Sequence, residues 1–507
     1  MKSLWLDRES SFTSDAIPDE KHFDTIVVGA GLTGMVTALL LSRSGQRVAV
    51  LEARTLGAAT TGNTTGKLSL LQGGALSALR GQYSLKVVQA YVEANRTGQA
   101  WLMRYMEEQG VPFQRRTAVT FATSDDGGQR LRKEAAVSRD AGLDVHFSRD
   151  PGLPFPVVEA LELDAQAQIH PMEVLETLAR DIREHGGLVV EGVQMQDVGS
   201  DLPVEVSTRK GAFTANAVVI ATGTPILNRG LYFAKLEPNR SYAAALRLPG
   251  ETPPPSGMYL SIDPPTRSQR THPTPEGELL LVGGYGHTGG RAASPKAHLD
   301  DLLAWANQHY PGAEVTHTWS AQDYRPTNLV PFFGKMPRGH GRIFFGTGYN
   351  KWGMSNGVAA ALSITSDILG GQSDWATVIH HRVTSPQGAL EAVRLNAGVA
   401  KRMVEDKARV RSNPEITDQT RPPEGSGVVG LYKGEPAAVS TVDGNVCMVS
   451  ASCAHLGGLL SWNDAEKSWD CPLHGSRFAP DGKYLEGPAT HNLQKSPLKK
   501  RASQESD

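Results

Sequence analysis

Two short loops near the end of the chain each carry one cysteine and one histidine, and they constrain the fold most strongly. The first reads Cys453-Ala454-His455 and the second Cys471-Pro472-Leu473-His474, with fifteen residues between them. Two thiolates and two imidazoles on paired loops suit a [2Fe–2S] cluster in which cysteines hold one iron and histidines the other. A structural zinc ion is the alternative. Zinc sites usually pair cysteine with cysteine and histidine with histidine, so the mixed loops favour the cluster.

The residues that follow the ligands are similar to those of Rieske domains. Leu456-Gly457 comes after the first histidine, and Gly475-Ser476 comes after the second. The resemblance implies a Rieske [2Fe–2S] cluster in a small all-β domain. Its ligands would be Cys453, His455, Cys471 and His474.

Two departures and the residue Ser476 refine this resemblance. Respiratory-type Rieske domains join their two ligand loops by a disulfide, but the corresponding positions here look to be Gly458 and Leu473. The chain therefore resembles ferredoxin-type Rieske modules more closely. We expect Ser476 to hydrogen-bond a cluster sulfide and raise the potential. Phe478 replaces a tyrosine of high-potential relatives, so we predict an intermediate value within the range of about −150 to +300 mV.

Composition limits the class of protein. A chain of 507 residues predicts two or three domains. Three cysteines cannot build a disulfide framework, which indicates a reducing compartment. The 51 basic and 53 acidic residues nearly balance, so nothing favours nucleic acid or an anionic membrane as partner. We find no secretory signal and no apolar run near the roughly 20 residues that span a bilayer. We expect a soluble, cytoplasmic protein.

The front of the chain carries a dinucleotide-binding pattern. An apolar strand, 26–28, leads into Gly29-x-Gly31-x-x-Gly34, then a helical run and a second strand that ends at Glu52. The glycines allow a tight turn, close approach of pyrophosphate and close packing of helix on strand. Glu52 can accept hydrogen bonds from ribose hydroxyls. A glycine-rich turn in another α/β unit is the alternative, but the full strand–loop–helix–strand–acid order favours a dinucleotide.

Three later segments favour FAD over NAD. A run rich in threonine and glycine, 57–73, follows the acid. The strand 218–223 resembles the crossing strand of two-dinucleotide-type flavoproteins, and residues 342–370 read as a strand, a glycine loop and a helix. Such a helix would point its N-terminus at the flavin pyrimidine and stabilise charge there.

These segments resemble the D-amino-acid oxidase, glycine oxidase and sarcosine oxidase family of FAD-dependent amine oxidoreductases, in the branch that carries a C-terminal Rieske domain. The resemblance extends from about residue 3 to 385. It implies FAD contacts with backbone, hydroxyl and acidic groups along this stretch. The residues carried over are Gly29, Gly31, Gly34, Glu52, Arg54, Thr61, Thr65, Gly66, Lys67, Met195, Ala221, Thr222, Gly223, Gly348, Gly353 and Met354. Relatives carry histidine where this chain has Asn63 and Gln72, which leaves the flavin linkage open.

The expected fold is an α/β FAD-binding Rossmann-like domain with an α+β substrate cap, followed by an all-β Rieske domain. The FAD-dependent part would span 1–385 and the Rieske domain 428–507, joined by a helical strut and linker over 386–427. Within the first part, FAD binding is assigned to 22–80, 166–234 and 336–385, and the cap to 81–165 and 235–335.

Candidate substrate residues come from the cap and from the glycine loop near 350. Aromatic rings over a flavin wall an apolar slot, and an arginine can clamp a carboxylate. The predicted catalytic set is Lys351, Trp352, Tyr242, Tyr259 and Arg267. Further pocket candidates are Arg270, Tyr285, His287, Arg325 and Tyr349. The tyrosines 242 and 259 fit sheet packing equally well, and the arginines 267 and 270 fit a solvated loop.

These parts predict an FAD-dependent dehydrogenase of a small amine or amino acid that sends electrons through the cluster to a one-electron acceptor protein or quinone. Direct hydride transfer requires orientation more than a strong base. The alternatives are an oxidase that makes hydrogen peroxide and a non-enzymatic redox sensor. A Rieske oxygenase is excluded by the lack of the usual H-x4-H iron-ligand spacing. The sequence leaves the substrate, the acceptor and the oligomeric state open.

Overall fold

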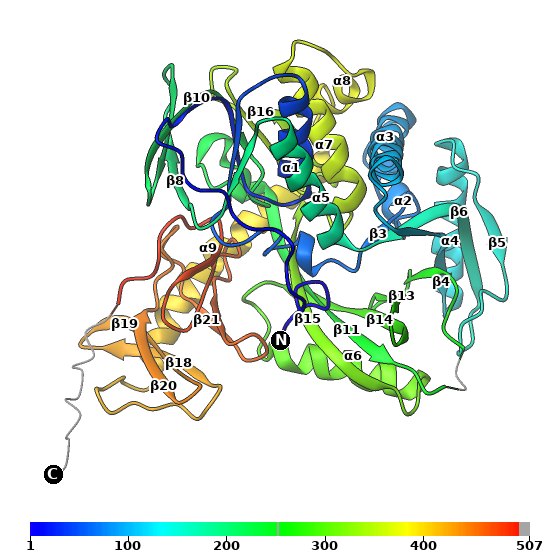
Figure 1. Ribbon diagram of the computed structural model, residues 1–507. Coiled ribbons are helices and arrows are strands. Elements are labelled where there is room, and N and C mark those ends of the chain that lie inside the picture. The colour runs from blue at the N-terminus through cyan, green and yellow to red at the C-terminus, as the bar shows by residue number, and fades with distance from the viewer. Residues whose placement is uncertain (251–252, 496–507) are drawn as a thin grey trace. The chain divides into compact units, whose positions relative to one another are not determined.

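The computed structural model describes residues 1–250 and 253–495 (Figure 1). The chain divides into two compact units. The first comprises Met1–His287 and Ala297–Val393, and the second comprises Thr288–Lys296 and Arg394–Asp507. Among the described residues, no helix combines the length and the apolar character needed to cross a membrane.

The first unit contains an eight-stranded sheet in the order β16-β17-β10-β1-β2-β7, with β9 beside β10 and β8 beside β9. The five strands from β17 to β7 pair in parallel, whereas β16 and β9 run antiparallel to their neighbours. The strands are β1 (His22–Val28), β2 (Val48–Leu51), β7 (Leu188–Val190), β8 (Met195–Val198), β9 (Val204–Thr208), β10 (Gly211–Ile220), β16 (Phe332–Lys335) and β17 (Ile343–Thr347).

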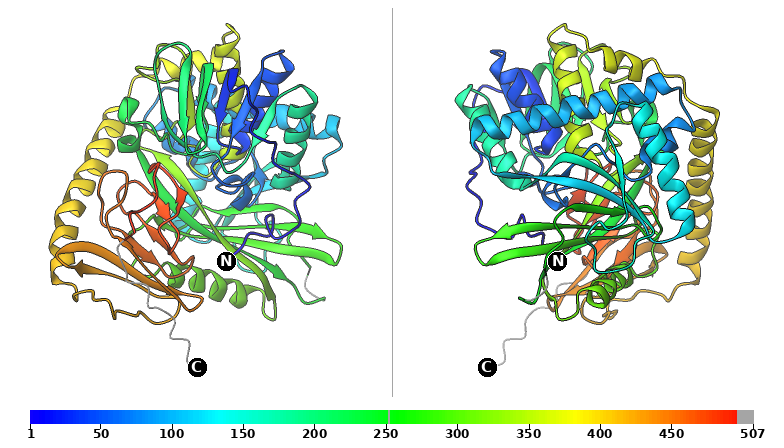
Figure 2. Two further views of the ribbon diagram at one scale, coloured as in Figure 1. Left: turned by 60° about the vertical axis from the view of Figure 1, so that its left-hand side comes forward. Right: turned by 90° about the vertical axis from the view of Figure 1, so that its right-hand side faces the viewer.

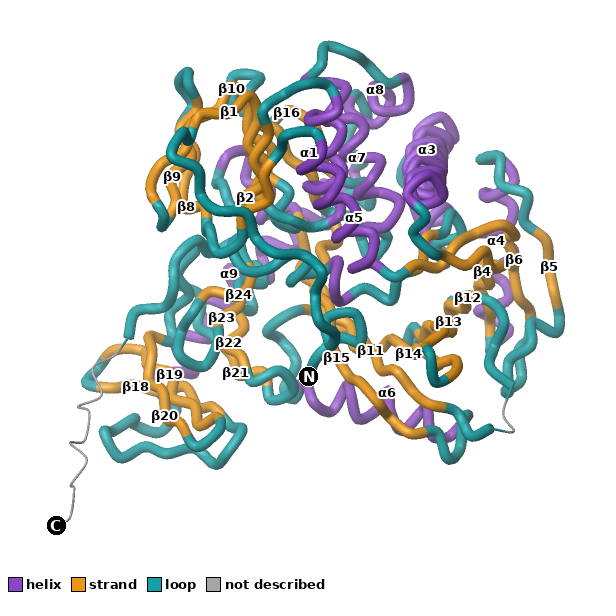
Figure 3. Tube along the Cα trace, in the orientation of Figure 1, coloured by secondary structure: helices purple, strands orange, loops and turns teal. Residues whose placement is uncertain are grey.

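Helices cover this sheet because parallel strands are apolar on both faces. Helix α1 (Leu32–Arg43) is buried around most of its circumference, since it packs on β1 and β2 and also contacts α5 and α7. Figure 3 shows these helices gathered beside the sheet, with α3 next to α7. The other helices of the unit are α2 (Ala75–Arg80), α3 (Leu85–Gln109), α4 (Asp125–Asp140), α5 (Pro171–Glu184), α7 (Gly353–Ile368), α8 (Asp374–His380) and the 3-10 turns η1 (Thr61–Asn63) and η2 (Arg229–Lys235).

The same unit holds a nine-stranded mixed sheet in the order β15-β11-β14-β13-β12-β4-β6-β3, with β5 beside β6. Its long β11–β15 ladder is antiparallel. Helix α6 (Pro295–His309) follows β14 and begins at the boundary between the units. The strands are β3 (Lys67–Leu68), β4 (Phe113–Ala122), β5 (His146–Ser148), β6 (Glu159–Ile169), β11 (Leu236–Arg247), β12 (Met258–Ser261), β13 (Arg267–Thr274), β14 (Gly277–Thr288) and β15 (Glu314–Pro326).

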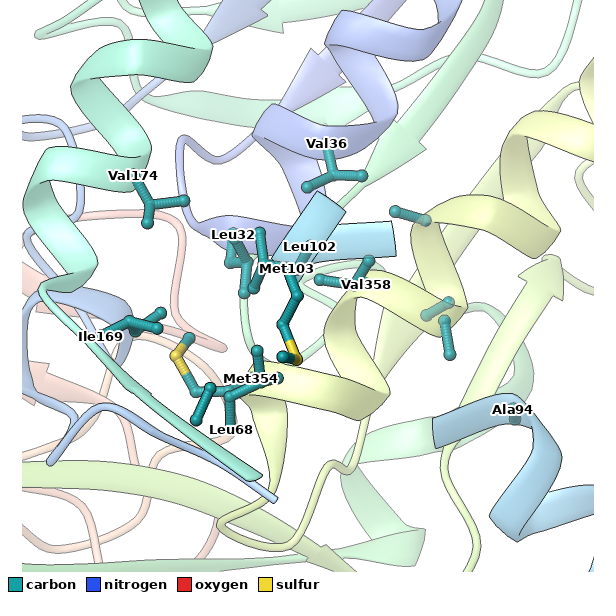
Figure 4. Close-up of a cluster of buried hydrophobic side chains, with 14 of the residues drawn as sticks. Leu32, Val36, Leu68, Ala94, Leu102, Met103, Ile169, Val174, Met354 and Val358 are labelled. Atoms are coloured by element: carbon teal, nitrogen blue, oxygen red, sulfur yellow. The ribbon is translucent and has the colours of Figure 1, made fainter. Parts of the chain in front are cut away.

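One hydrophobic core joins the helices of the first sheet to the second sheet. Figure 4 shows side chains from α1, α3 and α7 meeting side chains from β3, β6 and α5. All members are buried. Each Å² of apolar surface that they remove from water stabilises the fold by about 25 cal/mol. The two sheets therefore fold as one unit. The residues labelled in the figure are Leu32, Val36, Leu68, Ala94, Leu102, Met103, Ile169, Val174, Met354 and Val358.

The second unit is built from two small antiparallel sheets and most of α9 (Pro386–Ser412) (Figure 2). Val399, Met403 and Val410 of α9 pack on the core that contains Trp469 and Phe478. The first sheet comprises β18 (Gly427–Tyr432), β19 (Glu435–Val442) and β20 (Asn445–Ser450). The second comprises β21 (Ser461–Asn463), β22 (Ser468–Asp470), β23 (Arg477–Phe478) and β24 (Tyr484–Glu486).

Candidate cofactor and substrate sites

The predicted glycine loop connects β1 to α1 in a conformation that larger residues cannot adopt. Gly29 has φ 104°, and a Cβ there would lie 2.5 Å from the Ala221 carbonyl oxygen. A Cβ on Gly34 would lie 2.0 Å from the Gly29 carbonyl oxygen. Helix α1 therefore starts directly against the end of β1, with its N-terminal N–H groups at the loop, which is the arrangement that binds pyrophosphate.

Glu52, at the end of β2, holds this loop through both of its carboxylate oxygens. One oxygen accepts from the Ala30 backbone N–H at 2.9 Å and the other accepts from the Arg54 N–H at 2.8 Å. Burial raises the pKa of Glu52, while these two hydrogen bonds oppose that rise. Each oxygen keeps a further lone pair that a ribose hydroxyl can use. Met195, at the start of β8, is buried in the core that also contains Val28 and Leu51.

The segment 60–67 lies against the glycine loop and links it to the second sheet. The Thr61 hydroxyl accepts from the Leu32 N–H at 3.2 Å, and a Cβ on Gly31 would lie 3.2 Å from that hydroxyl. Lys67 Nζ donates to the Tyr259 carbonyl at 2.5 Å and to the Ser268 hydroxyl at 2.7 Å. Burial, followed by the charge of Arg270, lowers the pKa of Lys67. Thr61 thus faces the dinucleotide loop, whereas the Lys67 ammonium points into the cap.

The predicted crossing strand ends beside the same site. The Ala221 N–H donates to the Val28 carbonyl at 2.8 Å, and the Thr222 hydroxyl donates to the Thr224 carbonyl at 2.7 Å. Gly223, at φ 77°, accepts from the Thr347 hydroxyl at 2.6 Å. These bonds join the ends of β1, β10 and β17, where ligands bind in open parallel sheets.

The loop between β17 and α7 contains two consecutive residues that are not glycine and yet have positive φ, Asn350 at 49° and Lys351 at 71°. Such backbone conformations are costly and are often found at functional sites. The Asp323 carboxylate fixes them, because it accepts from the backbone N–H groups of Lys351 and Tyr324. Burial raises the pKa of Asp323, and its bonds to the two N–H groups oppose the rise. Sequence reasoning missed Asp323, because its place before Tyr324 in the long β15 strand carries no recognisable pattern.

Lys351 directs its ammonium towards the cap strand β14. A Cβ on Gly286 would lie 3.2 Å from Lys351 Nζ and 2.7 Å from the Ser241 hydroxyl. Because side chains alternate along a strand, Tyr285 and His287 point to the opposite face of β14, where His287 contacts His298 of α6. Burial of the charge lowers the pKa of Lys351, whereas Asp323 opposes that change. Trp352 caps α7, which begins at Gly353 with Met354 buried.

A buried polar network fixes the first turn of α7, and sequence reasoning did not find it. The Tyr91 hydroxyl donates to the Gln72 side chain at 2.6 Å, and the Ser355 hydroxyl donates to the Asn95 side chain at 2.6 Å. Asn95 also donates to the Asn356 side chain at 3.0 Å. The sequence feature that could have revealed it is Tyr91 and Asn95, two polar residues four positions apart on the buried face of α3. Gln72 therefore anchors the helix that is expected to face the flavin.

The remaining substrate candidates occupy different parts of the cap. The Tyr242 hydroxyl lies 3.0 Å from His287 Nε2, so this pair can hydrogen-bond. Arg267 stacks over the rings of Tyr285 and Trp305. The Tyr259 hydroxyl donates to the Pro151 carbonyl at 2.8 Å inside an apolar cluster. The structure thus places Tyr242 against His287 and His298 of α6, and Tyr259 in sheet packing.

Two other predicted candidates already have polar partners, Tyr349 in the β17–α7 loop and Arg325 in the cap. The Tyr349 hydroxyl accepts from the Thr33 hydroxyl at 3.0 Å, and burial raises its pKa. Arg325 forms an ion pair with Glu237 across the β11–β15 ladder at 3.6 Å.

In the second unit, the two cysteine–histidine loops fold alike and face each other. Each closes a turn by backbone hydrogen bonds, from Gly457 N–H to the Cys453 carbonyl at 3.0 Å and from Gly475 N–H to the Cys471 carbonyl at 3.2 Å. Both glycines have positive φ, 69° and 83°. The backbone therefore turns in the same way after each cysteine, although the histidine follows at a different spacing in the two loops.

The four side chains are arranged as a sulfur pair and an imidazole pair. The Cys453 and Cys471 sulfurs lie within hydrogen-bonding reach of each other, so the pKa of Cys453 is lowered and the pKa of Cys471 is raised. The His455 and His474 rings meet edge to face at 5.2 Å. Burial lowers the pKa of both histidines to about 4, which keeps their nitrogens neutral and able to bind metal.

This donor set fits a [2Fe–2S] cluster, in which each iron takes two protein ligands. The described part of the chain contains no group of three or more His, Cys, Asp or Glu side chains that could together hold a single metal ion. Two cysteines for one iron and two histidines for the other match the pairs observed. The pairing therefore favours the cluster over the zinc alternative.

The loops pack together without a disulfide. All three cysteines are free. A Cβ on Gly458 would lie 2.6 Å from Leu473 Cδ1 and 3.1 Å from Cys471 Sγ, so the leucine fills the space between the loops. The Ser476 hydroxyl accepts from the Ala489 N–H at 3.0 Å, and its proximity to Cys453 helps to lower the pKa of that thiol. Phe478 is fully buried.

A segment from within the predicted cap also belongs to the second unit. The Arg291 guanidinium donates to the Pro472 carbonyl at 2.9 Å. Asp464 accepts from the Ser294 hydroxyl at 2.6 Å and from the Lys296 N–H at 2.8 Å. A Cβ on Gly290 would lie 2.7 Å from the Pro472 backbone nitrogen, so only glycine fits there. Sequence reasoning missed this contact because it joins residues that are distant along the chain.

Comparison with known families identifies both regions. Residues 24–366 match the family described as FAD dependent oxidoreductase, and residues 416–497 match the Rieske [2Fe-2S] domain. YhfW of Bacillus subtilis (strain 168), named as a Rieske 2Fe-2S iron-sulfur protein, is 27% identical over 488 residues, which cover 95% of each chain.

Solved structures share the fold of the first unit. Glycine oxidase from Geobacillus kaustophilus is 20% identical with a TM-score of 0.57, and the match covers 70% of this chain and 96% of that one. L-proline dehydrogenase from P. horikoshii is 16% identical with a TM-score of 0.57, and the match covers 71% and 96%.

These findings confirm the expected fold class, the two cofactors FAD and [2Fe–2S], and the predicted resemblance. The individual FAD and substrate residues stay predictions. The chain belongs to the FAD dependent oxidoreductase family and carries a Rieske [2Fe-2S] domain in its C-terminal part.

Proposed function

We propose that this protein is a dehydrogenase of a small amino acid or amine and that the electrons leave through the Rieske cluster to a one-electron acceptor protein or quinone. The observation that carries the proposal is the presence, in one chain, of a complete dinucleotide loop and a paired two-cysteine, two-histidine site. FAD supplies a two-electron acceptor, and the cluster supplies a carrier of single electrons.

In the reaction, the substrate C–N single bond becomes an imine as one hydride and one proton leave. Water then hydrolyses the imine to a carbonyl compound and ammonia or an amine. The two electrons leave in single steps, so two equivalents of a one-electron acceptor balance each turnover.

Lys351 supports an amino acid as the substrate class. Its ammonium lies close to Gly286 and Ser241, where it can pair with a carboxylate. The Asp323 bonds to the strained backbone hold it there. Orientation of this kind lowers the barrier to hydride transfer without a strong base.

The test is anaerobic mixing of the holoprotein with matched amino acids and amines, while flavin and cluster absorbance are followed separately. Lys351→Met should raise KM for the amino acid by about 10- to 100-fold, because it loses a charge-assisted hydrogen bond to the carboxylate. The KM for amines without a carboxylate should stay unchanged. Lys335→Met, at an exposed position on β16, is the control. An equal effect on both substrate classes would contradict the carboxylate role.

A second measurement separates a dehydrogenase from an oxidase. With substrate present and no other acceptor, a dehydrogenase should consume oxygen slowly, and added one-electron acceptor should increase turnover. Rapid peroxide formation that does not depend on the cluster would favour the oxidase. If no substrate in the panel bleaches the flavin, the redox-sensor alternative stands instead.

A further inference from the structure

The first residues of the chain form a single turn that is buried against segment 60–67, which is predicted to contact FAD. The Lys2 N–H donates to the Thr318 carbonyl of β15 at 3.0 Å, and the Asp7 N–H donates to the Ser3 carbonyl at 2.9 Å. This turn places Trp5 in the interior with none of its surface exposed. Full burial of a tryptophan is uncommon, because its indole N–H then requires a partner.

That partner is the segment 60–67. The Trp5 indole donates to the Thr64 carbonyl at 2.6 Å, and the Trp319 indole donates to the Asn63 carbonyl at 2.9 Å. The Arg270 guanidinium donates to the next carbonyl, that of Thr65. Three consecutive carbonyls thus accept from three buried side chains on three separate elements. Since each peptide plane has a fixed carbonyl direction, these bonds set the orientation of residues 63–65.

Arg270 joins the same cluster and is not directed at a substrate. It lies 5.2 Å from the Trp5 ring in a cation–π contact and donates to the Ile169 carbonyl at 3.1 Å. A Cβ on Gly66 would lie 2.5 Å from the Ile169 carbonyl oxygen, so the chain passes between these groups without room for a side chain.

Two histidines complete the surroundings of Trp5. The Trp5 ring meets His170 at 4.9 Å and His272 at 4.7 Å, in both cases edge to face. Burial lowers the pKa of His170 to about 4 and that of His272 to about 3, so both are neutral near pH 7. Burial lowers the pKa of Arg270 to about 9, which leaves it charged. The guanidinium is then the charged group against the indole ring.

The far end of the clamped segment reaches the glycine loop. Thr61 accepts from the first N–H of α1, beside Gly31, where the pyrophosphate of a dinucleotide would bind. The Thr60 hydroxyl donates to the Gln322 carbonyl at 2.6 Å and ties the start of the segment to β15.

We propose that Trp5 is a positioning residue for FAD: together with Arg270 and Trp319 it clamps residues 63–65 and so holds Thr61 and Thr65 in place for the cofactor. The inference goes beyond the proposed reaction and depends only on the predicted contact of segment 60–67 with FAD. The first seven residues are then part of the cofactor site.

Trp5→Phe tests the clamp because it keeps an aromatic ring and removes the N–H donor. The dissociation constant for FAD, measured by titration of apoprotein with FAD, should rise about tenfold, the value of one lost buried hydrogen bond. Trp101→Phe is the matched control, since Trp101 stacks on Tyr105 of α3 and should leave FAD affinity unchanged.

Thermal unfolding separates positioning from a general structural role. A clamp predicts a larger fall in Tm for the FAD-bound protein than for apoprotein. An equal fall in both, with unchanged FAD affinity, would overturn the proposal. If Trp5→Phe does not fold, Trp319→Phe removes the adjacent donor and carries the same expectation.

Thr61→Ala tests separately whether segment 60–67 contacts FAD, which is the prediction that the clamp requires. Weaker FAD binding in both variants supports the proposal. If Thr61→Ala weakens binding and Trp5→Phe does not, the clamp is wrong. If neither variant changes binding, segment 60–67 does not contact FAD and both ideas fail.

Discussion

The two cofactor regions of this chain are built on opposite principles. The cluster site uses four side chains within a stretch of 22 residues, from Cys453 to His474. The dinucleotide site relies mainly on backbone, with the room left by Gly29 and Gly34 and the N–H groups held by Glu52. Removal of one ligand atom should therefore disrupt the cluster site, whereas addition of one Cβ atom at a glycine should disrupt the dinucleotide site.

The largest expected effect is the loss of the cluster in Cys453→Ala. Without its thiolate, one iron keeps a single cysteine ligand, so iron and acid-labile sulfide should fall to background while FAD remains bound. Electron exit to external one-electron acceptors should stop, and flavin reduction by substrate should persist. Cys447→Ala, on β20, is the control and should keep the full cluster. Loss of FAD together with the cluster would remove the distinction between the two regions.

Gly34→Ala is the converse test and should have the next largest effect. The added Cβ would lie 2.0 Å from the Gly29 carbonyl oxygen, so α1 must shift away from the loop. Overpacking of this kind costs about 1–3 kcal/mol, which corresponds to about 5- to 150-fold weaker FAD binding. Isothermal titration of apoprotein measures it, and the iron content should not change. Gly398→Ala, with open space in α9, should leave FAD affinity as it is.

Ser476→Ala should give the smallest effect, a lower cluster potential without loss of the cluster. The hydroxyl lies close to the Cys453 sulfur, and an O–H hydrogen bond donated to it would stabilise the more electron-rich reduced state. Loss of one such bond, about 1.4 kcal/mol, lowers a one-electron potential by about 60 mV. A redox titration followed by electron paramagnetic resonance measures this shift, with Ser461→Ala on β21 as the control. An unchanged potential would show that the hydroxyl does not tune the centre.

The sequence allowed the cluster ligands and the glycine loop to be predicted, because both depend on residue type at short spacing. Asp323 and the Gln72–Asn95–Ser355 network were not predicted, since their roles follow from contacts between distant strands and helices. Arg270 was predicted as a pocket candidate from its residue type, yet its guanidinium holds backbone carbonyls. Charged groups buried in a sheet cannot be separated from substrate ligands by residue type alone.

The contacts of residues 288–296 have a consequence for how the Rieske part could be separated or exchanged. Asp464 and Pro472 bind Ser294 and Arg291, which lie far upstream in the chain, between β14 and the body of α6. A shortened protein that starts at residue 394 would lack these groups. The iron–sulfur part is therefore not an interchangeable tail, and a graft onto another oxidoreductase would have to carry the upstream peptide with it.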